Sequence, residues 1–187
     1  MMKENHRGIK LTRPVVLVGM MGSGKTRLGR MLAQALGVPF LDTDDMVMAA
    51  AGAPIPEIFK TAGEAVFRQY EADAIRKVLK DGALPRVIST GGGAVMRPEN
   101  ADLIFGNTLS LWVQADIDVL LERVGRNNDR PLLQGSDPEK TLRDMAEIRY
   151  PVYGRADLVV DTGHGTPQQI LSDTLKLIKE KSGSWSL

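Results

Sequence analysis

One glycine-rich stretch constrains the fold more than any other part of this chain of 187 residues. The stretch GMMGSGKT, residues 19–26, directly follows the apolar run VVLV and precedes a segment with leucine and methionine at helical spacing. A buried strand, a glycine turn and a helix from about residue 25 to 36 are therefore expected in succession. Gly19, four intervening residues, and then Gly24, Lys25 and Thr26 match the P-loop pattern.

The residue types of this loop suit the phosphates of a nucleoside triphosphate. Glycines let backbone N–H groups turn inward around an anion, and the helix N-terminus adds its dipole. Lys25 is placed to reach the β- and γ-phosphates, and the Thr26 hydroxyl to ligate Mg²⁺. The alternative is a glycine-rich turn with an exposed lysine. The expected ATP contacts in this part of the chain are Gly22, Ser23, Gly24, Lys25, Thr26 and Arg27.

The remainder of the chain alternates between short apolar runs and helical patterns. Further strands are predicted in VPFLDTD, RVIST, TLSLWV and DLVVD. One further helix is expected to follow the first of these strands and to end near Gly52, and others are expected over residues 64–79, 116–124, 139–150 and 167–181. Such alternation predicts an α/β fold with a mostly parallel sheet. Ligands in these folds bind at the carboxyl ends of the strands, where the unusual residues of this chain fall.

Composition excludes several classes of protein. The net charge is +1, so neither nucleic acid nor an acidic membrane surface is attracted by the chain as a whole. No apolar stretch approaches the roughly 20 residues of a membrane helix. The chain has no cysteine, which fits a reducing cytosol. We expect one domain over residues 14–181, with flexible tails at 1–13 and 182–187.

Acidic residues follow the second predicted strand. Asp42 and Asp44 stand two apart in LDTDD, and in an extended segment this spacing points both side chains the same way. One carboxylate could then hold Mg²⁺ through water while the other meets an acceptor hydroxyl. The alternative is helix capping by Asp44 or Asp45, a common role of aspartate.

Two further motifs suit an acceptor site. In GEAVFRQYEADAI, Arg68 and Glu71 are three residues apart and share a helix face, although a surface ion pair is the alternative. Residues 91–93 are three glycines that follow the third strand. They permit a close backbone approach with N–H groups free for a ligand, and a simple loop is the alternative.

Arginines later in the chain suit a transferring phosphoryl group and a carboxylate. Arg130 precedes Pro131 in a polar loop at residues 125–138 and could stabilise charge during transfer. Arg149 lies near the end of a predicted helix, and the guanidinium fork matches a carboxylate bidentately. Solvated surface is the alternative for each arginine.

Taken together, these motifs resemble the shikimate kinases. The likeness covers about residues 15–177 and rests on GMMGSGKT, FLDTD, IPEIFKTAGEAVFR, STGGGAV, RPLL and RYPVYGRAD in this order. It implies a three-layer P-loop NTPase fold with a central five-stranded parallel sheet, a substrate-binding helical segment at about 44–80 and a mobile lid at about 125–138. It also implies transfer of the γ-phosphoryl group of ATP to the 3-hydroxyl of shikimate, with Mg²⁺, in cytoplasmic aromatic amino acid biosynthesis.

The resemblance also implies roles for individual residues. The catalytic groups are Asp44, which meets the 3-hydroxyl, with Lys25 and Arg130 steadying the phosphoryl group. The substrate-binding residues are Arg68 and Arg149 on the carboxylate, Glu71 orienting Arg68, and Gly91, Gly92 and Gly93 in the turn. Thr26 and Asp42 serve Mg²⁺, and Arg126 and Pro167 lie near the adenine, between the segment 123–126 and the loop at 166–167. The chain lacks an aspartate after the third strand, where P-loop proteins usually carry one.

Two other functions remain open at this stage. Another small-molecule kinase, such as a gluconate kinase, would share the loop and the fold but differ in the acceptor site. A catalytically silent ATP-binding module would bind ATP and regulate a partner protein without catalysing a reaction. We expect a monomer that binds a small-molecule substrate, and no nucleic acid or membrane.

Overall fold

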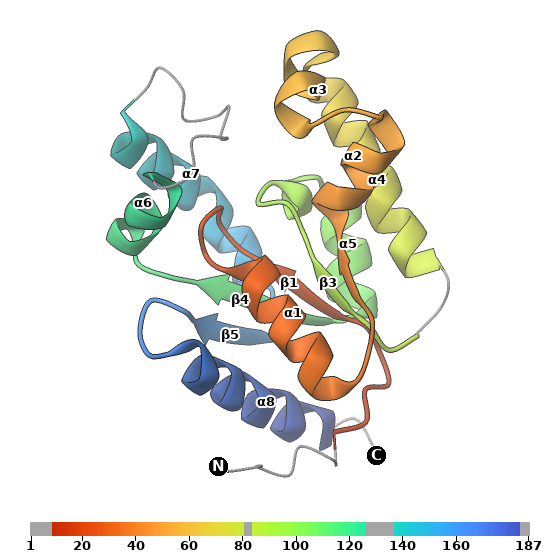
Figure 1. Cartoon of the computed structure of the whole chain (residues 1–187), viewed down its shortest axis with the longest axis vertical. Helices are drawn as coiled ribbons and strands as arrows, with labels where there is room; N and C mark the ends of the chain where they lie inside the picture. Colours follow the sequence, from red (N-terminus) through yellow and green to blue (C-terminus); the bar gives the residue numbers. More distant parts are fainter. Residues whose placement is uncertain (1–8, 81–83, 126–136, 184–187) are drawn as a thin grey trace.

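Five short parallel strands form the centre of the protein (Figure 1). The structure is a computed structural model, and it describes residues 9–80, 84–125 and 137–183, apart from the side chains of residues 182 and 183. The strands are β1 (Val15–Val18), β2 (Phe40–Asp42), β3 (Val87–Ser89), β4 (Leu109–Gln114) and β5 (Leu158–Asp161). They lie in the order β2-β3-β1-β4-β5, with every neighbouring pair parallel. The predicted α/β fold with a five-stranded parallel sheet is confirmed.

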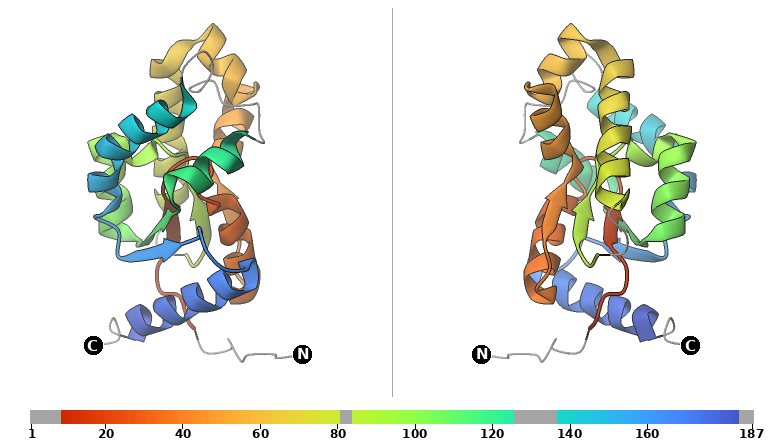
Figure 2. Two further views of the ribbon diagram at one scale, coloured as in Figure 1. Left: turned by 90° about the vertical axis from the view of Figure 1, so that its left-hand side faces the viewer. Right: turned by 90° about the vertical axis from the view of Figure 1, so that its right-hand side faces the viewer.

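Helices cover both faces of this sheet. The helices are α1 (Lys25–Leu36), α2 (Thr43–Ala51), α3 (Ile55–Thr61), α4 (Gly63–Lys80), the 3₁₀ turn η1 (Ala94–Met96), α5 (Pro98–Asn107), α6 (Ile117–Gly125), α7 (Pro138–Tyr153) and α8 (Pro167–Gly183). Figure 2 shows α1 and α5 on opposite sides of the sheet. The sheet with a helical layer on each side therefore makes the three layers that the family resemblance implies.

The buried strand β1 divides its side chains between two cores. Val15 and Leu17 pack in the core that contains α1 and α8, whereas Val16 and Val18 pack in the core that contains α4, α5 and Tyr153. Since successive side chains of a strand point to opposite faces, a strand covered on both sides must be apolar throughout. This explains why VVLV shows no polar alternation.

The sheet order places the P-loop at the crevice where ligands bind in such folds. From β1 the chain crosses to β2 and returns to β3 on one side, and then builds β4 and β5 on the other side. The loop after β1 lies at this switch point, at the carboxyl ends of the strands. The segment α2–α4 rises above that edge as a separate helical unit, seen at the top of Figure 1.

Three predictions about the helices were wrong or incomplete. The helix predicted to stop at Tyr150 continues through Pro151 to Tyr153, because burial of Tyr153 outweighs the cost of an interior proline. The helices α3 and α5 were not predicted, although each has a proline at its first or second helical position. Along the described residues, no helix combines the length and the apolar character needed to cross a membrane.

Candidate active site

The P-loop has the geometry that its glycines predict. Gly22 and Gly24 have φ values of 79° and 89°, in the left-handed region that favours glycine. Gly24 immediately precedes the first residue of α1, so the loop leads directly into the helix N-terminus. The Lys25 ammonium donates to the carbonyls of Gly19 and Met20 at 2.9 and 2.7 Å. This buried lysine therefore lies within the curve of the loop, where an anion would meet both the amides and the charge.

Asp42 connects the P-loop to the helical segment that follows β2. Its Oδ2 accepts a hydrogen bond from Thr26 Oγ1 at 2.9 Å, and its Oδ1 accepts one from the Asp44 backbone N–H at 3.0 Å. Asp42 is therefore the N-cap of α2, and the alternative that Asp44 or Asp45 caps this helix was wrong. The assumption of an extended LDTDD segment was also wrong, since α2 begins at Thr43.

With capping assigned to Asp42, the Asp44 carboxylate faces the glycine turn after β3. Its Oδ1 lies 2.9 Å from the point that a Cβ on Gly91 would occupy. Asp44 also lines a polar pocket of about 360 Å³, whereas Asp45 is exposed and does not line it. The pocket also includes Gly22, Gly24, Lys25 and Thr26 of the P-loop, and Gly91 and Gly92. The structure thus brings a carboxylate and a phosphate-binding loop to one cavity of ligand size.

The three glycines at 91–93 are required by close approach. A Cβ on Gly91 would lie 2.7 Å from Glu71 Oε1, and a Cβ on Gly93 would lie 2.5 Å from Arg68 Nη1. A Cβ on Gly92 would lie 3.3 to 3.4 Å from the P-loop backbone and from Arg149 Nη1. Each glycine therefore makes room for a charged side chain predicted for the substrate site. None of the three needs a positive φ.

Arg68 and Glu71 form an ion pair that is not on the surface. Arg68 Nη1 lies 3.0 Å from Glu71 Oε2, and Arg68 Nη2 lies 3.0 Å from Glu64 Oε1. The Glu71 side chain is only 2 % exposed, and burial raises its pKa although Arg68 opposes the shift. Its Oε1 is buried without a hydrogen-bond partner in the described structure. The surface alternative for this pair was therefore wrong.

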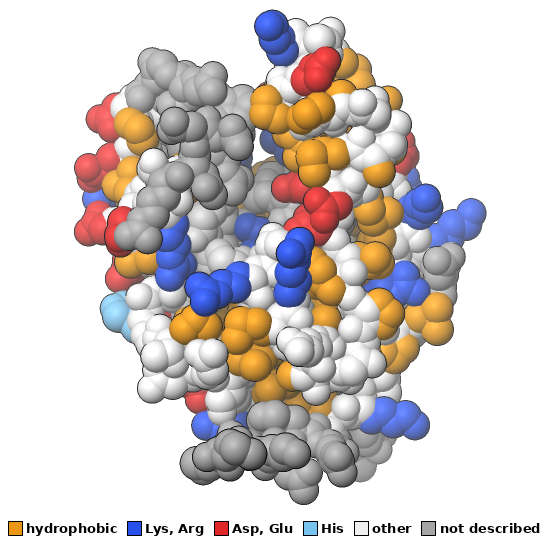
Figure 3. Space-filling model, viewed as in Figure 1, with side chains coloured by type: hydrophobic (Ala, Val, Ile, Leu, Met, Phe, Trp, Pro, Cys, Tyr) orange, Lys and Arg blue, Asp and Glu red, His pale blue; other side chains and the backbone are white. Residues whose placement is uncertain are grey.

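Arg149 is brought to the same turn from α7. It is 9 % exposed, and among the described residues no carboxylate lies within 4.0 Å of its guanidinium nitrogens. By contrast, Arg155 is exposed and pairs with Asp102 at 3.0 Å, so it belongs to the surface. Figure 3 shows acidic and basic side chains around a hollow beside the α2–α4 segment. The site thus combines two inward arginines with two carboxylates.

A second pocket of about 360 Å³ adjoins the first. Both pockets include Gly24, Arg27 and Arg123, and the second is also lined by Met31, Thr162 and Pro167. Arg123 donates to the Thr162 carbonyl at 2.6 Å, and the Thr162 hydroxyl donates to the Ser23 carbonyl at 2.7 Å. The predicted adenine site between the segment 123–126 and the loop at 166–167 thus coincides with a cavity, in the part that the structure describes.

Several predicted residues lie outside the described residues, and several useful ones were missed. Arg126 and Arg130, and most of the expected lid at 125–138, fall in the undescribed segment 126–136. Ser89 stands at the end of β3 where an aspartate is usual, and its Oγ lies 3.4 Å from Thr26 Oγ1. Tyr153 and Thr162 were also missed. The sequence IST at a strand end indicated Ser89, but nothing local indicated the other two.

Three comparisons with known proteins point to one family. A family model described as "SKI: Shikimate kinase" matches residues 21–179. A shikimate kinase of Caulobacter vibrioides is 44% identical over 163 residues, which cover 87% of this chain and 80% of that protein. Shikimate kinase from Acinetobacter baumannii in complex with shikimate superimposes with a TM-score of 0.87 and 34% identity, covering 94% of this chain and 98% of that one.

A more distant likeness shows the fold alone. A gluconokinase from Sinorhizobium meliloti has a TM-score of 0.61 and 19% identity, and covers 95% of this chain and 99% of that one. The family-model match at residues 21–179 includes the predicted acceptor-site motifs. This chain belongs to the shikimate kinase family.

Proposed function

We propose that this kinase transfers the γ-phosphoryl group of ATP to the 3-hydroxyl of shikimate, and releases ADP and shikimate 3-phosphate. The observation that carries the proposal is the buried guanidinium of Arg149, which has no carboxylate partner among the described residues. A buried guanidinium that has no carboxylate within ion-pair distance is costly, so this arginine favours an anionic ligand. The fork of a guanidinium matches a carboxylate, which a hydroxy acid such as shikimate supplies.

The acceptor side would use groups from three elements. Arg68 and Arg149 hold the substrate carboxylate, and Glu71 keeps Arg68 in place through their 3.0 Å contact. The Gly92 N–H, which has no hydrogen-bond partner within the described chain, offers a donor to a substrate hydroxyl. Asp44 accepts the proton of the attacking hydroxyl. Most of the catalysis then comes from positioning of the acceptor against the phosphoryl group.

The donor side would use the P-loop and the adjoining pocket. The amides of Gly22–Thr26 and the Lys25 ammonium hold the β- and γ-phosphates, with the neighbouring Arg27 at the rim. The second pocket accommodates the base against Pro167. Arg126 and Arg130, which lie outside the described residues, complete this side, Arg130 by stabilising charge on the phosphoryl group.

The residues beside the P-loop fit a magnesium ion held together with ATP. Thr26 Oγ1, Asp42 Oδ2 and Ser89 Oγ form an all-oxygen set, the kind of ligand that Mg²⁺ prefers. The described residues contain no group of three or more acidic or histidine side chains that could hold a metal ion by itself, and a Mg²⁺ shared with phosphates and water does not need one. When bound, Mg²⁺ neutralises charge on the phosphates.

The organisation around this site is also part of the proposal. Residues 14–181 form a single kinase domain with a substrate-binding segment at 44–80 and a lid at 125–138, flanked by tails at 1–13 and 182–187. The active unit in this proposal is a monomer whose two adjoining pockets hold the acceptor and the nucleotide. The absence of cysteine is consistent with the cytoplasm.

The proposal is tested by measuring ADP release from Mg-ATP with four reactions in parallel, which contain shikimate, gluconate, AMP or no acceptor. Turnover with shikimate alone is expected. Turnover with gluconate or AMP instead would keep the phosphate site and refute the acceptor assignments. ATP binding without turnover under any condition would favour a silent nucleotide-binding module.

A further inference from the structure

The middle carbonyl of the glycine turn depends on one distant side chain. The Gly91 carbonyl accepts from the Ala94 N–H at 3.1 Å, and the Gly93 carbonyl accepts from the Met96 N–H at 3.0 Å. These two are local backbone bonds that the turn makes by itself. The Gly92 carbonyl instead accepts a hydrogen bond from the hydroxyl of Tyr153, 61 residues further along the chain.

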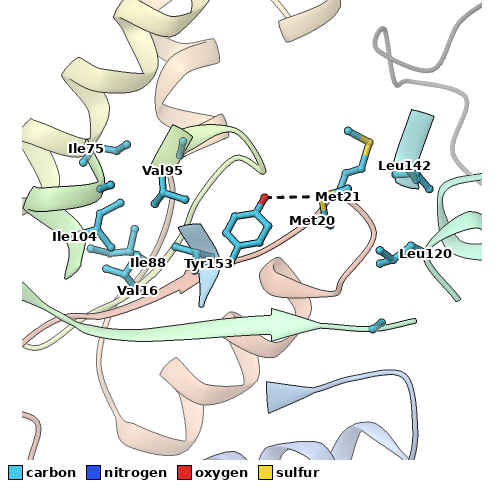
Figure 4. Close-up of a cluster of buried hydrophobic side chains, with 14 of the residues drawn as sticks. Val16, Met20, Met21, Ile75, Ile88, Val95, Ile104, Leu120, Leu142 and Tyr153 are labelled. Atoms are coloured by element: carbon cyan, nitrogen blue, oxygen red, sulfur yellow. Dashed lines mark hydrogen bonds between the residues drawn. The ribbon is translucent and has the colours of Figure 1, made fainter. Parts of the chain in front are cut away.

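The Tyr153 side chain lies in the hydrophobic core, and its hydroxyl extends to the glycine turn. Its side chain is fully buried, and its hydroxyl lies 4.0 Å from the Sδ of Met20 in the P-loop. Figure 4 shows the ring among apolar side chains, with the hydroxyl directed toward the P-loop methionines. Arg149 precedes it by one turn of α7 and so shares its helix face. The Tyr153 hydroxyl therefore interacts with the glycine turn, the P-loop and the Arg149 side chain.

Holding the Gly92 carbonyl constrains more than one atom. A peptide unit is planar, so the Gly92 carbonyl and the Gly93 N–H turn together, and the turn cannot rotate about that unit while the bond is present. Gly92 lies between the P-loop backbone and Arg149. A Cβ added to Gly92 would lie 3.3 to 3.4 Å from backbone atoms of the P-loop and 3.4 Å from Arg149 Nη1. A rotation of this unit would redirect the Gly93 N–H, would disturb the adjoining Gly91–Gly92 unit through the shared Gly92 Cα, and would change the space available to Arg149.

We propose that Tyr153 is a positioning residue of this enzyme: its buried hydroxyl holds the glycine turn in the orientation that receives the phosphoryl acceptor. The proposal rests on the proposed function, because it assigns the turn to the acceptor. Burial raises the pKa of Tyr153 to about 12, against an opposing effect of Arg149. The hydroxyl therefore keeps its proton, and remains a donor, at every pH at which the enzyme would be assayed.

The decisive variant is Tyr153→Phe, which removes only the hydroxyl and keeps the packed ring. We expect the KM for shikimate to rise about tenfold, which corresponds to one lost hydrogen bond and a disordered turn. The KM for ATP should stay within about twofold, since no nucleotide group contacts this turn in the proposal. The Tm should fall by about 5 °C, as for one buried acceptor left unpaired.

Tyr150→Phe is the matched control. Tyr150 lies on the same helix and packs on Trp112 at 5.2 Å, but its hydroxyl has no hydrogen-bond partner within the described structure. Its kinetics should equal those of the wild type. An equal rise in the shikimate KM for both variants would attribute the effect to the aromatic cluster and overturn the proposal. A parallel loss for shikimate and ATP in Tyr153→Phe would reduce Tyr153 to a structural role.

The wild-type protein supplies an independent test if Tyr153→Phe does not fold. A buried, hydrogen-bonded hydroxyl exchanges slowly with water, so its proton should be visible by NMR and should shift as shikimate is added. Absence of any shift at saturating shikimate would overturn the proposal. A wild type that does not phosphorylate shikimate would refute the proposed function, whereas active wild type with unchanged Tyr153→Phe kinetics would refute only this inference.

Discussion

Replacing Gly93 by alanine should displace the Arg68 guanidinium while changing the free energy of unfolding only slightly. Gly93 has φ −95° and ψ −2°, a conformation that alanine adopts without backbone strain. The new Cβ would lie 2.5 Å from Arg68 Nη1 and 2.9 Å from its Cζ and Nη2. Since ordinary contact begins at 3.4 Å, the guanidinium must retreat by about 0.9 Å.

The two expected consequences differ in size. The clash involves the free end of a flexible, half-buried side chain, so the free energy of unfolding should fall by less than about 1 kcal/mol. A misplacement of about 1 Å in a substrate-positioning group can cost about 10²-fold in rate. We therefore expect kcat/KM for shikimate to fall about 10- to 100-fold, while the KM for ATP changes little.

The assay compares ADP release at varied shikimate and at varied ATP with thermal unfolding of the same preparations. Gly106→Ala in α5 is the control, because a Cβ there meets nothing within 4 Å. It should leave the kinetics unchanged and increase the free energy of unfolding by about 0.5 kcal/mol, as for glycine to alanine in a helix. Wild-type shikimate kinetics in Gly93→Ala would refute the contact between Arg68 and the substrate carboxylate.

Three further predictions test other parts of the site. Asp44→Asn should lower kcat by about 10²-fold or more, and Asp45→Asn should not, because Asp45 is exposed and lies off the pocket; the reverse result would move the role to Asp45. Thr162→Val removes the hydroxyl that holds the Ser23 carbonyl, so the KM for ATP should rise about fivefold with no change for shikimate, and an unchanged KM for ATP would exclude this role. Burial raises the pKa of Glu71 in the folded state above its ordinary 4.5, so its contribution to the free energy of unfolding is fully present below pH 4.5 and falls as the pH rises through the raised pKa. Thermal unfolding of Glu71→Gln between pH 4 and 8 should lack this decline, and equal pH slopes for variant and wild type would contradict it.

The P-loop and its helix were predictable because their information is local. Gly24 and Gly37 both adopt left-handed φ values and flank α1 on its two sides. The helix therefore begins and ends at the residues predicted from the sequence. The order of strands and helices was predictable for the same reason, since apolar periodicity reports which faces are buried. The missed helices α3 and α5 are short or weakly periodic, and only their prolines mark them.

The candidate site was predictable as a set of residues but not as an arrangement. The carboxylates, arginines and glycines were identified by their motifs and by the ends of strands where they stand. The sequence left Asp44 or Asp45 open as the cap of α2, whereas the structure uses Asp42, because only the start of the helix at Thr43 decides which aspartate precedes it. Glu71 was also undecided, since a buried and an exposed ion pair have the same spacing.

The sequence by itself determined the phosphate loop and the parallel α/β architecture, because these follow from local backbone preferences and side-chain periodicity. Its motifs named the candidate acceptor residues without arranging them. Only the tertiary structure decided that α7 continues through Pro151 and that the Tyr153 hydroxyl meets the carbonyl of Gly92. The reason is that a buried polar group needs a hydrogen-bond partner, and packing of the core determines which partner lies within reach. Which groups meet across 61 residues is settled only when the sheet and its helices are in place.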